Sequence, residues 1–349
     1  MVTMKDVAQL AGVSVSTVSI VVNNKAKERS IPLDTYNKVI DAASQLGYQP
    51  NVSARRLRNP STPKPVIALY WPLDERTNIL ATLLSNIQLE LSKNNFDCEL
   101  IIQTYTNDKF KEYCKEIINN TYSGVIIGAA SQSDIDYLES ISTNSPIILI
   151  NRKSEKYSTV KVNSTDVADQ GVSLLLENSI KNVAVISTEA KYYESSKRIS
   201  AFMSACKKND ISIDKDHTIS VPNSYEGGIK AAEKYLLMKE MPNVIFCESD
   251  IIVLGMIYKF NRLNISVPDD VSIISIGSTS SSNTEYSTPS VTVIDIPSEE
   301  IVSNVISILL EKLTEKDLHN KLTPIHKKIT PIIKIRDSFP KTKSEKDNS

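Results

Sequence analysis

The stretch VTMKDVAQLAGVSVSTVSIVVN, residues 2–23, has the pattern of two short helices joined by a tight turn. Thr3 and Asp6 form a capping-box-like start for the first helix. Gly12 can take the left-handed conformation that ends this helix, and Ser14 is placed to cap the second. The second helix carries an apolar stripe of valines at positions 15, 18, 21 and 22. The pattern predicts a helix-turn-helix whose second helix enters a DNA major groove, and a small helical hairpin of another kind is the alternative.

The composition is typical of a soluble globular protein, with 41% hydrophobic and 23% charged residues. At about 100–200 residues per domain, the 349 residues predict two or three domains. No apolar run approaches the ~20 residues of a membrane span, and the N-terminus has no apolar signal-peptide core. We therefore expect a cytoplasmic protein without a membrane partner.

The cysteines and histidines form no disulfide or metal-binding pattern. No two cysteines have the CxxC spacing, and the histidines do not cluster with them. The residues concerned are Cys98, Cys114, Cys206, Cys247, His217, His319 and His326. We expect the thiols to be core residues, and the protein to use no metal and no cofactor.

Positive charge is concentrated at the N-terminal end of the chain. Residues 1–60 contain eight Lys or Arg and four Asp or Glu, which leaves −5 for the remainder of a chain whose net charge is −1. A basic head on a slightly acidic body fits polyanion binding by the head alone.

Two more helical segments follow in the N-terminal region. The run from Leu33 to Leu46 has a helical apolar face and ends before Gly47. The run PNVSARRLR, residues 50–58, can form about two helical turns capped by Asn51, which is too short to be stable alone. Prolines at 60, 63 and 65 mark a linker. We therefore expect a helix-turn-helix head over residues 1–49, and a hinge helix with its linker over residues 50–64.

From Val66 onward, buried apolar runs alternate with amphipathic helical stretches. The runs cover residues 66–70, 99–102, 125–127, 147–150, 183–186, 244–247 and 271–276. The helical stretches cover residues 79–91, 109–119, 167–176, 198–207, 228–238, 251–261 and 298–313. This alternation predicts an α/β fold with two doubly wound parallel sheets of about five or six strands. In such folds, ligands bind beyond the carboxyl ends of the strands.

The predicted body covers residues 65–337 and divides into two lobes. Lobe one takes about residues 65–160 and 291–324, and lobe two about residues 161–290 and 325–337. Residues 338–349 are charged and poor in apolar side chains, so we expect a disordered tail there.

The chain resembles the lac repressor/galactose repressor (LacI/GalR) family of bacterial transcription regulators. The matching segments are TMKDVAQLAGVSVSTVS (3–19), Asn23–Asn24, LGYQPN (46–51), ARRLR (54–58), PIILINR (146–152), Arg198, ESDIIVLG (248–255) and ISVPDDVSIISIG (265–277). The resemblance implies a helix-turn-helix head, a hinge helix and a body like the periplasmic sugar-binding proteins. It also implies a homodimer on a pseudo-palindromic double-stranded DNA operator, with an affinity that a small ligand alters.

The resemblance assigns DNA contacts to the head. The residues that would face base edges are Val15, Ser16 and Ile20, and further contacts would come from Thr3, Thr17, Ser19 and Asn23. Ile20 departs from the family, which commonly has an arginine at this position. Arginine binds guanine in a bidentate way, and isoleucine does not. We therefore predict weakened guanine selection at the base pair that faces Ile20; the alternative is that Ile20 packs against the third helix.

The resemblance also assigns DNA contacts to the hinge, at Asn51, Ala54, Arg55, Leu57 and Arg58. Leu57 matches the family's hinge leucine, which wedges into the minor groove at the operator centre and kinks the duplex. The neighbouring arginines would offset phosphate charge. A solvated basic linker is the alternative. Because so short a helix would fold only on DNA with its partner from the other subunit, small shifts in the body would decide whether it forms.

An effector site is expected in the body. The resemblance carries Arg152, Arg198 and Asp250 over as pocket residues, and their forked donors and carboxylate suit polyol or anionic ligands. Interdomain salt bridges are the alternative reading of these three residues.

A second group of candidate effector residues lies near Trp71, the only tryptophan. Asp74, Arg76 and Asn78 come just after it, beyond the first strand. An aromatic ring with polar neighbours at the carboxyl end of a strand suits the face of a sugar. A place for Trp71 at the dimer interface is the alternative.

The predicted pocket is less acidic than is usual in the family. Many members carry an acidic residue after the strand at 271–276, where this chain has Gly277, Ser278 and further hydroxyl residues. Asn151 also replaces the usual aspartate before Arg152. Our hypothesis is a phosphorylated or otherwise anionic sugar, with hydroxyl groups such as that of Ser278 as partners.

The predicted function is repression of carbohydrate-utilisation genes, with operator affinity changed by a sugar or a sugar-derived effector. The alternative is a regulator that depends on a corepressor or a partner protein and has a non-sugar ligand. An enzyme on an α/β scaffold is disfavoured, because the chain has no Walker loop, no GxGxxG after a strand, no GxSxG elbow and no HExxH.

Overall fold

The structure is a computed structural model of the chain, and it describes residues 4–22, 26, 29, 31–46, 64–74, 76–189, 193–239, 241–277 and 281–340. The chain divides into a head, Met1–Lys64, and a body, Pro65–Ser349.

The head packs α1 (Met4–Ala11), α2 (Val15–Val22) and α3 (Leu33–Gln45) around a small apolar core. The fully buried side chains of this core are Val7, Val18, Val21 and Val39. Gly12 has a φ of +62°, which confirms the predicted left-handed turn. The backbone N–H of Thr17 donates to Ser14 Oγ at 3.1 Å, which confirms the predicted cap of α2. The Thr3 cap and the hinge helix at 50–58 lie outside the described residues.

The described residues of the body form two six-stranded sheets, in agreement with the predicted fold. The first sheet has the order β11 (His326–Ile329), β5 (Ser158–Val162), β4 (Ile147–Ile150), β3 (Gly124–Gly128), β1 (Val66–Pro72), β2 (Glu99–Tyr105). The second has the order β12 (Ile332–Lys334), β10 (Thr292–Asp295), β9 (Ser272–Gly277), β8 (Val244–Cys247), β6 (Val183–Thr188), β7 (Thr218–Val221). Paired strands run parallel in both sheets, except that β12 is antiparallel to β10.

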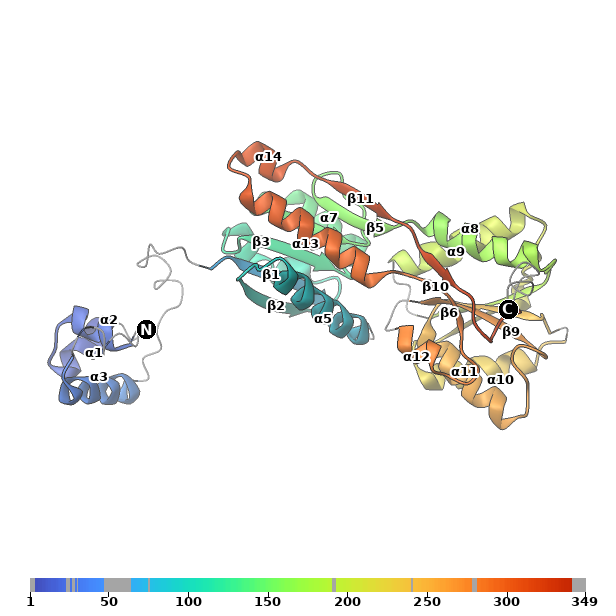
Figure 1. The fold of residues 1–349 in the computed structure, drawn as a ribbon, viewed down its shortest axis with the longest axis horizontal. Coiled ribbons are helices and arrows are strands. Elements are labelled where there is room, and N and C mark those ends of the chain that lie inside the picture. Colours follow the sequence, from blue (N-terminus) through green and yellow to red (C-terminus); the bar gives the residue numbers. More distant parts are fainter. Residues whose placement is uncertain are drawn as a thin grey trace. The chain divides into compact units, whose positions relative to one another are not determined.

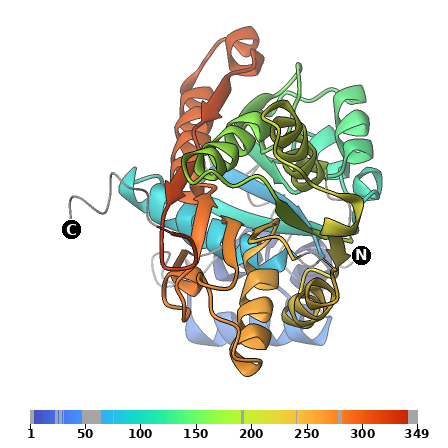
Figure 2. The ribbon, with the colours of Figure 1, turned by 90° about the vertical axis from the view of Figure 1, so that its right-hand side faces the viewer.

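Helices cover both faces of each sheet (Figures 1 and 2). On the first sheet, one face packs against α5 (Thr77–Lys93) and α13 (Ser298–Thr314), and the other against α6 (Lys115–Ile118), α7 (Gln132–Ser140) and the 3₁₀ turn η1 (Phe110–Glu112). On the second sheet, one face packs against α8 (Ser164–Glu177) and α9 (Tyr193–Lys208), and the other against α10 (Tyr225–Leu236) and α11 (Asp250–Arg262). The short elements are α12 (Ser281–Glu285), α14 (Leu318–Leu322) and the 3₁₀ turn η2 (Lys215–His217).

The chain crosses between the two lobes at three places in the described residues: between β5 and α8, between β10 and α13, and between β11 and β12. These crossings correct the predicted lobe boundaries. Strand β10 was expected in lobe one but belongs to the second sheet, and β11 was expected in lobe two but belongs to the first. Strand β11 gives no apolar signal in the sequence, because its sequence is HKKI and most of it is exposed.

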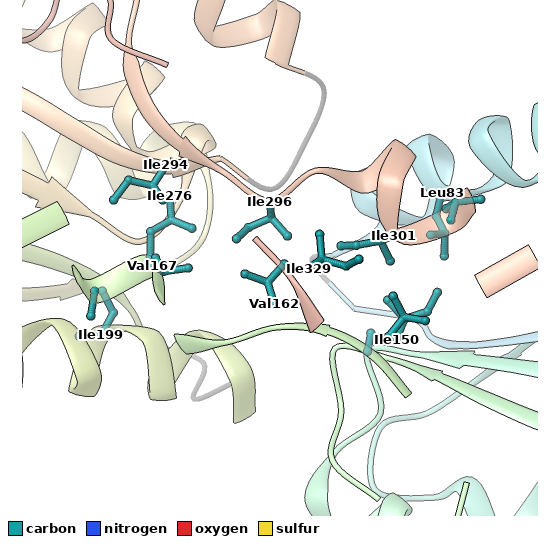
Figure 3. Close-up of a cluster of buried hydrophobic side chains, with 14 of the residues drawn as sticks. Leu83, Ile150, Val162, Val167, Ile199, Ile276, Ile294, Ile296, Ile301 and Ile329 are labelled. Atoms are coloured by element: carbon teal, nitrogen blue, oxygen red, sulfur yellow. The ribbon is translucent and has the colours of Figure 1, made fainter. Parts of the chain in front are cut away.

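Apolar side chains pack together where the chain crosses the boundary between the lobes (Figure 3). Val162, Ile296 and Ile329 come from the three crossings and are 1%, 7% and 3% exposed. They belong to one continuous core cluster that extends from Leu83 on α5 to Ile199 on α9. The two lobes therefore share a core at the crossings, and a change in their relative orientation must repack these side chains.

The C-terminal boundary of the body also differs from the prediction. Ser338 and Phe339 were expected in a disordered tail, but both are buried. Ser338 Oγ donates to the carbonyl of Ile273 at 2.7 Å and accepts from the N–H of Thr292 at 2.8 Å. A single phenylalanine in a charged segment does not stand out by composition, so the sequence could not show this anchor. The rest of the predicted tail, residues 341–349, lies outside the described residues.

Candidate nucleic-acid interface and ligand site

The outward face of α2 offers hydroxyl and apolar groups. Val15 and Ser16 are exposed, and Thr17, Ser19 and Ile20 are half-buried. Val15 is 37% exposed, so the buried stripe of α2 does not include it. No charged residue lies within α2, whose sequence is VSTVSIVV. This face can therefore contact base edges through methyl and hydroxyl groups but not through a guanidinium fork.

Ile20 does not behave as a core residue of the head. The partly buried apolar side chains packed on the core of the head are Ala11, Val13, Ala26, Ile31, Tyr36, Ala43 and Leu46, and Ile20 is not among them. The alternative interpretation, that Ile20 packs against α3, has no support from these contacts.

Three hydroxyl groups meet at the start of α2. Ser14 Oγ lies 2.8 Å from Ser16 Oγ and 2.8 Å from Thr17 Oγ1, and it also accepts from the N–H of Thr17. The sequence predicted the cap but not this cluster, since its geometry depends on side-chain rotamers. The other predicted DNA contacts lie outside the described residues; they are Thr3, Asn23, Asn51, Ala54, Arg55, Leu57 and Arg58.

In the body, the carboxyl ends of both sheets face the boundary between the lobes. Strands β5, β10 and β11 each lead across this boundary from their carboxyl ends. Because strands in each sheet are parallel to these, the residues that follow β1, β4, β6, β8 and β9 reach the same boundary. Most of the predicted effector residues are in these positions, and the boundary is therefore the candidate ligand site.

Asp74 and Arg76 bind each other at the end of β1. Arg76 Nε donates to Asp74 Oδ1 at 2.9 Å and to Oδ2 at 3.1 Å, and the NH2 nitrogen of its guanidinium group forms an ion pair with Oδ2. The backbone N–H of Arg76 also donates to Asp74 Oδ1 at 2.9 Å. Both side chains are largely buried, at 10% and 15% exposure. This bidentate pair neutralises its own charge, so it shapes the loop more than it adds charge to the site.

Arg152 ties two loops of the first lobe together. Its Nε donates to the carbonyl of Ala130 after β3, and its NH1 donates to the carbonyl of Asn151 at 2.6 Å. Asn151 has a φ of +50°, and its Oδ1 accepts from the N–H of Val162 at 3.0 Å. Position 151 therefore anchors the end of β4 to the crossing at β5.

Trp71 is a core residue rather than an open aromatic surface. It is 4% exposed and belongs to the apolar cluster shared by the lobes, because β1 is buried along its whole length. It is therefore placed neither as an exposed sugar platform nor on a protein surface for dimerisation. Asn78 lies in the first turn of α5, and Ser278 lies outside the described residues.

The second lobe contributes buried charged groups. Arg198 lies on α9 and is 7% exposed, and Asp250 begins α11 and is 2% exposed. Ser275 Oγ donates to Asp250 Oδ1 at 3.2 Å, which connects α11 to β9. Glu248 lies within the segment that resembles the family but is not among the predicted effector residues. Its carboxylate accepts from the N–H of Thr188 at 2.9 Å and from its hydroxyl at 3.0 Å, next to Asp250 in sequence.

Tyr105 and Asp134 form a further polar group in the first lobe that sequence reasoning missed. The Asp134 carboxylate accepts from the N–H groups of Phe110, Asp108 and Ser131 at 3.0, 3.2 and 3.3 Å. Burial raises the pKa of the Tyr105 hydroxyl, and the charge of Asp134 raises it further. Tyr105 therefore remains a neutral donor at physiological pH. The sequence contains a signal for Tyr105, because this residue stands at the end of a strand. The same kind of position singled out Asp74, which follows a strand.

Neither a membrane helix nor a metal site is found in the described part of the chain. No helix there is long and apolar enough to cross a bilayer. The same residues contain no cluster of three His, Cys, Asp or Glu side chains that could hold a metal ion.

A helix-turn-helix head and a body of two doubly wound lobes define a bacterial transcription regulator of the periplasmic-binding type. Residues 3–51 match the bacterial regulatory proteins of the lacI family, and residues 172–339 match the periplasmic binding protein-like domain. The crystal structure of a LacI family transcription regulator from Clostridium acetobutylicum is 36% identical, with a TM-score of 0.71, and covers 78% of this chain and 100% of its own. The chain belongs to the lacI family, and it is a regulator rather than an enzyme.

Two further relatives cover almost the whole chain. The HTH-type transcriptional repressor PurR of Photobacterium profundum is 27% identical over 345 residues, which are 97% of this chain and 99% of the relative. The crystal structure of the lac repressor dimer bound to operator and the anti-inducer ONPF is 19% identical, has a TM-score of 0.67 and covers 97% of this chain and 99% of its own. The second likeness shows the fold alone.

Proposed function

We propose that this protein is a homodimeric repressor whose affinity for its operator is set by a small molecule bound between the two lobes. The observation that carries the proposal is the convergence of buried charged residues from both lobes on one boundary, in a chain that also has a helix-turn-helix head. The similar PurR protein is named a repressor, and the similar lac repressor is a dimer on its operator with a small molecule. Both descriptions favour the same arrangement here.

The effector that the site fits best is anionic and polar, such as a sugar phosphate. Three arginines are buried beyond the carboxyl ends of strands: Arg76 after β1, Arg152 after β4, and Arg198 on α9 after β6. Arg152 comes from the first lobe and Arg198 from the second, so the two lobes each supply a buried guanidinium group. Guanidinium groups bind carboxylate and phosphate oxygens in a bidentate way. The second candidate is a neutral ligand that acts as a corepressor, which the buried acids Glu248 and Asp250 favour.

The test is a thermal-shift titration of the full-length protein with sugars, sugar phosphates and nucleobases. A ligand at about 100 times its Kd should stabilise the protein by about 2.7 kcal/mol. Arg198→Met should abolish the shift, and Lys208→Met, an exposed residue of the same helix, should leave it unchanged. Stabilisation by neutral sugars but not by sugar phosphates would exclude the anionic effector.

An operator selected from a random DNA library then gives the sign of the effect. Loss of operator binding on adding the ligand identifies an inducer, and gain identifies a corepressor. If the protein selects no DNA sequence, the proposed function is wrong.

A further inference from the structure

The hydroxyl cluster at the start of α2 restricts which protons can point toward DNA. Ser14 Oγ has one proton to donate and two lone pairs with which to accept. The N–H of Thr17 uses one lone pair, at 3.1 Å. One lone pair and one proton remain for the two neighbouring hydroxyls, each at 2.8 Å. One of the two neighbours must therefore donate to Ser14, and the other must accept from it.

This count couples the hydroxyls of Ser16 and Thr17. If Ser16 donates to Ser14, Ser16 can only accept from outside and Thr17 keeps its proton for an outside partner. If Thr17 donates to Ser14, the roles are reversed. While the cluster is intact, one of the two side chains can donate a proton to DNA and the other can only accept.

The helix geometry decides between the two states. At about 100° per residue, Ser16 lies roughly 170° from the mean direction of the buried Val18 and Val21, whereas Thr17 lies only roughly 70° from it. Ser16 is therefore at the centre of the outward face and Thr17 on its flank, in accord with the exposed Ser16 and the half-buried Thr17. A helix in the major groove turns the centre of its outward face to the base edges and its flanks to the phosphate walls.

Resting on the proposed DNA binding by the head, we propose that Thr17 donates its hydroxyl proton to a phosphate oxygen and that Ser16 presents only lone pairs to the facing base. Phosphate oxygens accept hydrogen bonds and cannot donate them, so Thr17 must keep its proton for the phosphate. Ser16 then donates to Ser14 and accepts from the base. In the major groove only adenine N6 and cytosine N4 donate, so Ser16 selects an amino-bearing base and rejects the keto oxygens of thymine and guanine.

The experiment uses the full-length protein and an operator selected from a random library. The operator position that faces Ser16 is identified as the one at which the wild type prefers a base and Ser16→Ala does not. For the wild type we expect adenine or cytosine there. Replacing that base by its analogue without the amino group should weaken binding about threefold to tenfold, the effect of one hydrogen bond.

Two variants of Thr17 test the coupling without changing Ser16. Thr17→Val removes the hydroxyl, so Ser14 can donate to Ser16 and Ser16 can donate to a base. In this variant, the affinity for an operator with an amino-bearing base at this position should be within about twofold of the affinity for an operator with a keto base there. Thr17→Ser keeps the hydroxyl and should keep the preference. Each preference is a ratio measured within one protein, so a general loss of affinity in Thr17→Val does not affect it.

Each outcome has one meaning. A keto base selected by the wild type at the Ser16-sensitive position, or an amino preference that survives in Thr17→Val, overturns the inference while leaving DNA binding intact. Failure to select any sequence overturns the proposed function as well. The analogue series on the wild-type protein gives an answer even if Thr17→Val does not fold.

Discussion

The indole ring of Trp71 lies directly against the α-carbon of Gly128 on the neighbouring strand. A methyl group added to Gly128 would come within 2.5 Å of the indole Cζ3 and 2.8 Å of its Cε3. Residue 128 ends β3, and Trp71 lies near the end of β1, so this contact joins two neighbouring strands where they reach the boundary between the lobes.

We predict that Gly128→Ala destabilises the body by about 1–3 kcal/mol, because the added methyl group would press on a buried indole ring. Trp71→Phe should relieve most of this cost, because phenylalanine lacks the fused ring that meets the added methyl group. Denaturant unfolding of the two single variants and the double variant gives the coupling energy. Strict additivity of the two changes would contradict the contact.

Phe339 should anchor the C-terminal end of the body. It is 1% exposed, so Phe339→Ala is expected to lower the free energy of unfolding by about 3–5 kcal/mol. Removal of residues 341–349 serves as the control, and we expect it to leave the melting temperature unchanged because the segment is charged and poor in apolar residues. An unchanged stability in Phe339→Ala would show that the chain end does not pack as described.

Operator affinity should fall steeply as salt concentration rises, because the basic head displaces counterions from phosphates. The slope of log K against log salt should be about −0.9 for each phosphate contacted. Arg58→Gln should make this slope shallower by about one unit if Arg58 contacts one phosphate. Lys38→Gln is a suitable control, since Lys38 already pairs with Asp34 at 2.8 Å on α3. An affinity independent of salt would contradict the model of DNA binding.

Ile20 should leave one base pair of the operator weakly specified. We predict that the wild type shows little guanine preference there, since the side chain has no donor for guanine O6 and N7. Ile20→Arg should introduce a guanine preference worth about 1–3 kcal/mol, measured as relative affinities for operators that differ at this base pair. A strict guanine in the wild-type operator, lost in Ile20→Ala, would refute the prediction.

Much of the fold could be predicted from local patterns. The first two helices, the Gly12 turn and the Ser14 cap are set by residues within a few positions of one another. The central strands are buried on both faces and read as continuous apolar runs, as in β8 with the sequence VIFC. Edge strands did not show this signal: β7 alternates exposed and buried residues, and β11 is mostly exposed. The predicted helix at 109–119 is broken into η1 and α6, and Asp134 on α7 accepts the N–H of Phe110 at the start of η1 at 3.0 Å.

The candidate ligand site could be predicted only in outline. Residues such as Arg152 and Asp250 lie at strand ends where the pattern placed them, but their partners come from elsewhere in the chain. Ala130 lies 22 positions before Arg152, and Ser275 lies 25 positions after Asp250. Sequence spacing does not encode such pairings, so it could not distinguish a ligand contact from an internal hydrogen bond. The same holds for Trp71, whose burial depends on the close approach of Gly128.

The sequence by itself determined the class of fold, the location of the head and the chemistry available on α2, because these depend on short-range periodicity, turn residues and side-chain type. Only the tertiary structure decided where the chain crosses between the lobes, that Phe339 closes the core and that three hydroxyls meet at Ser14. These features depend on contacts between distant segments or on rotamers, and the free energy that selects them comes from packing and hydrogen bonding in the folded chain.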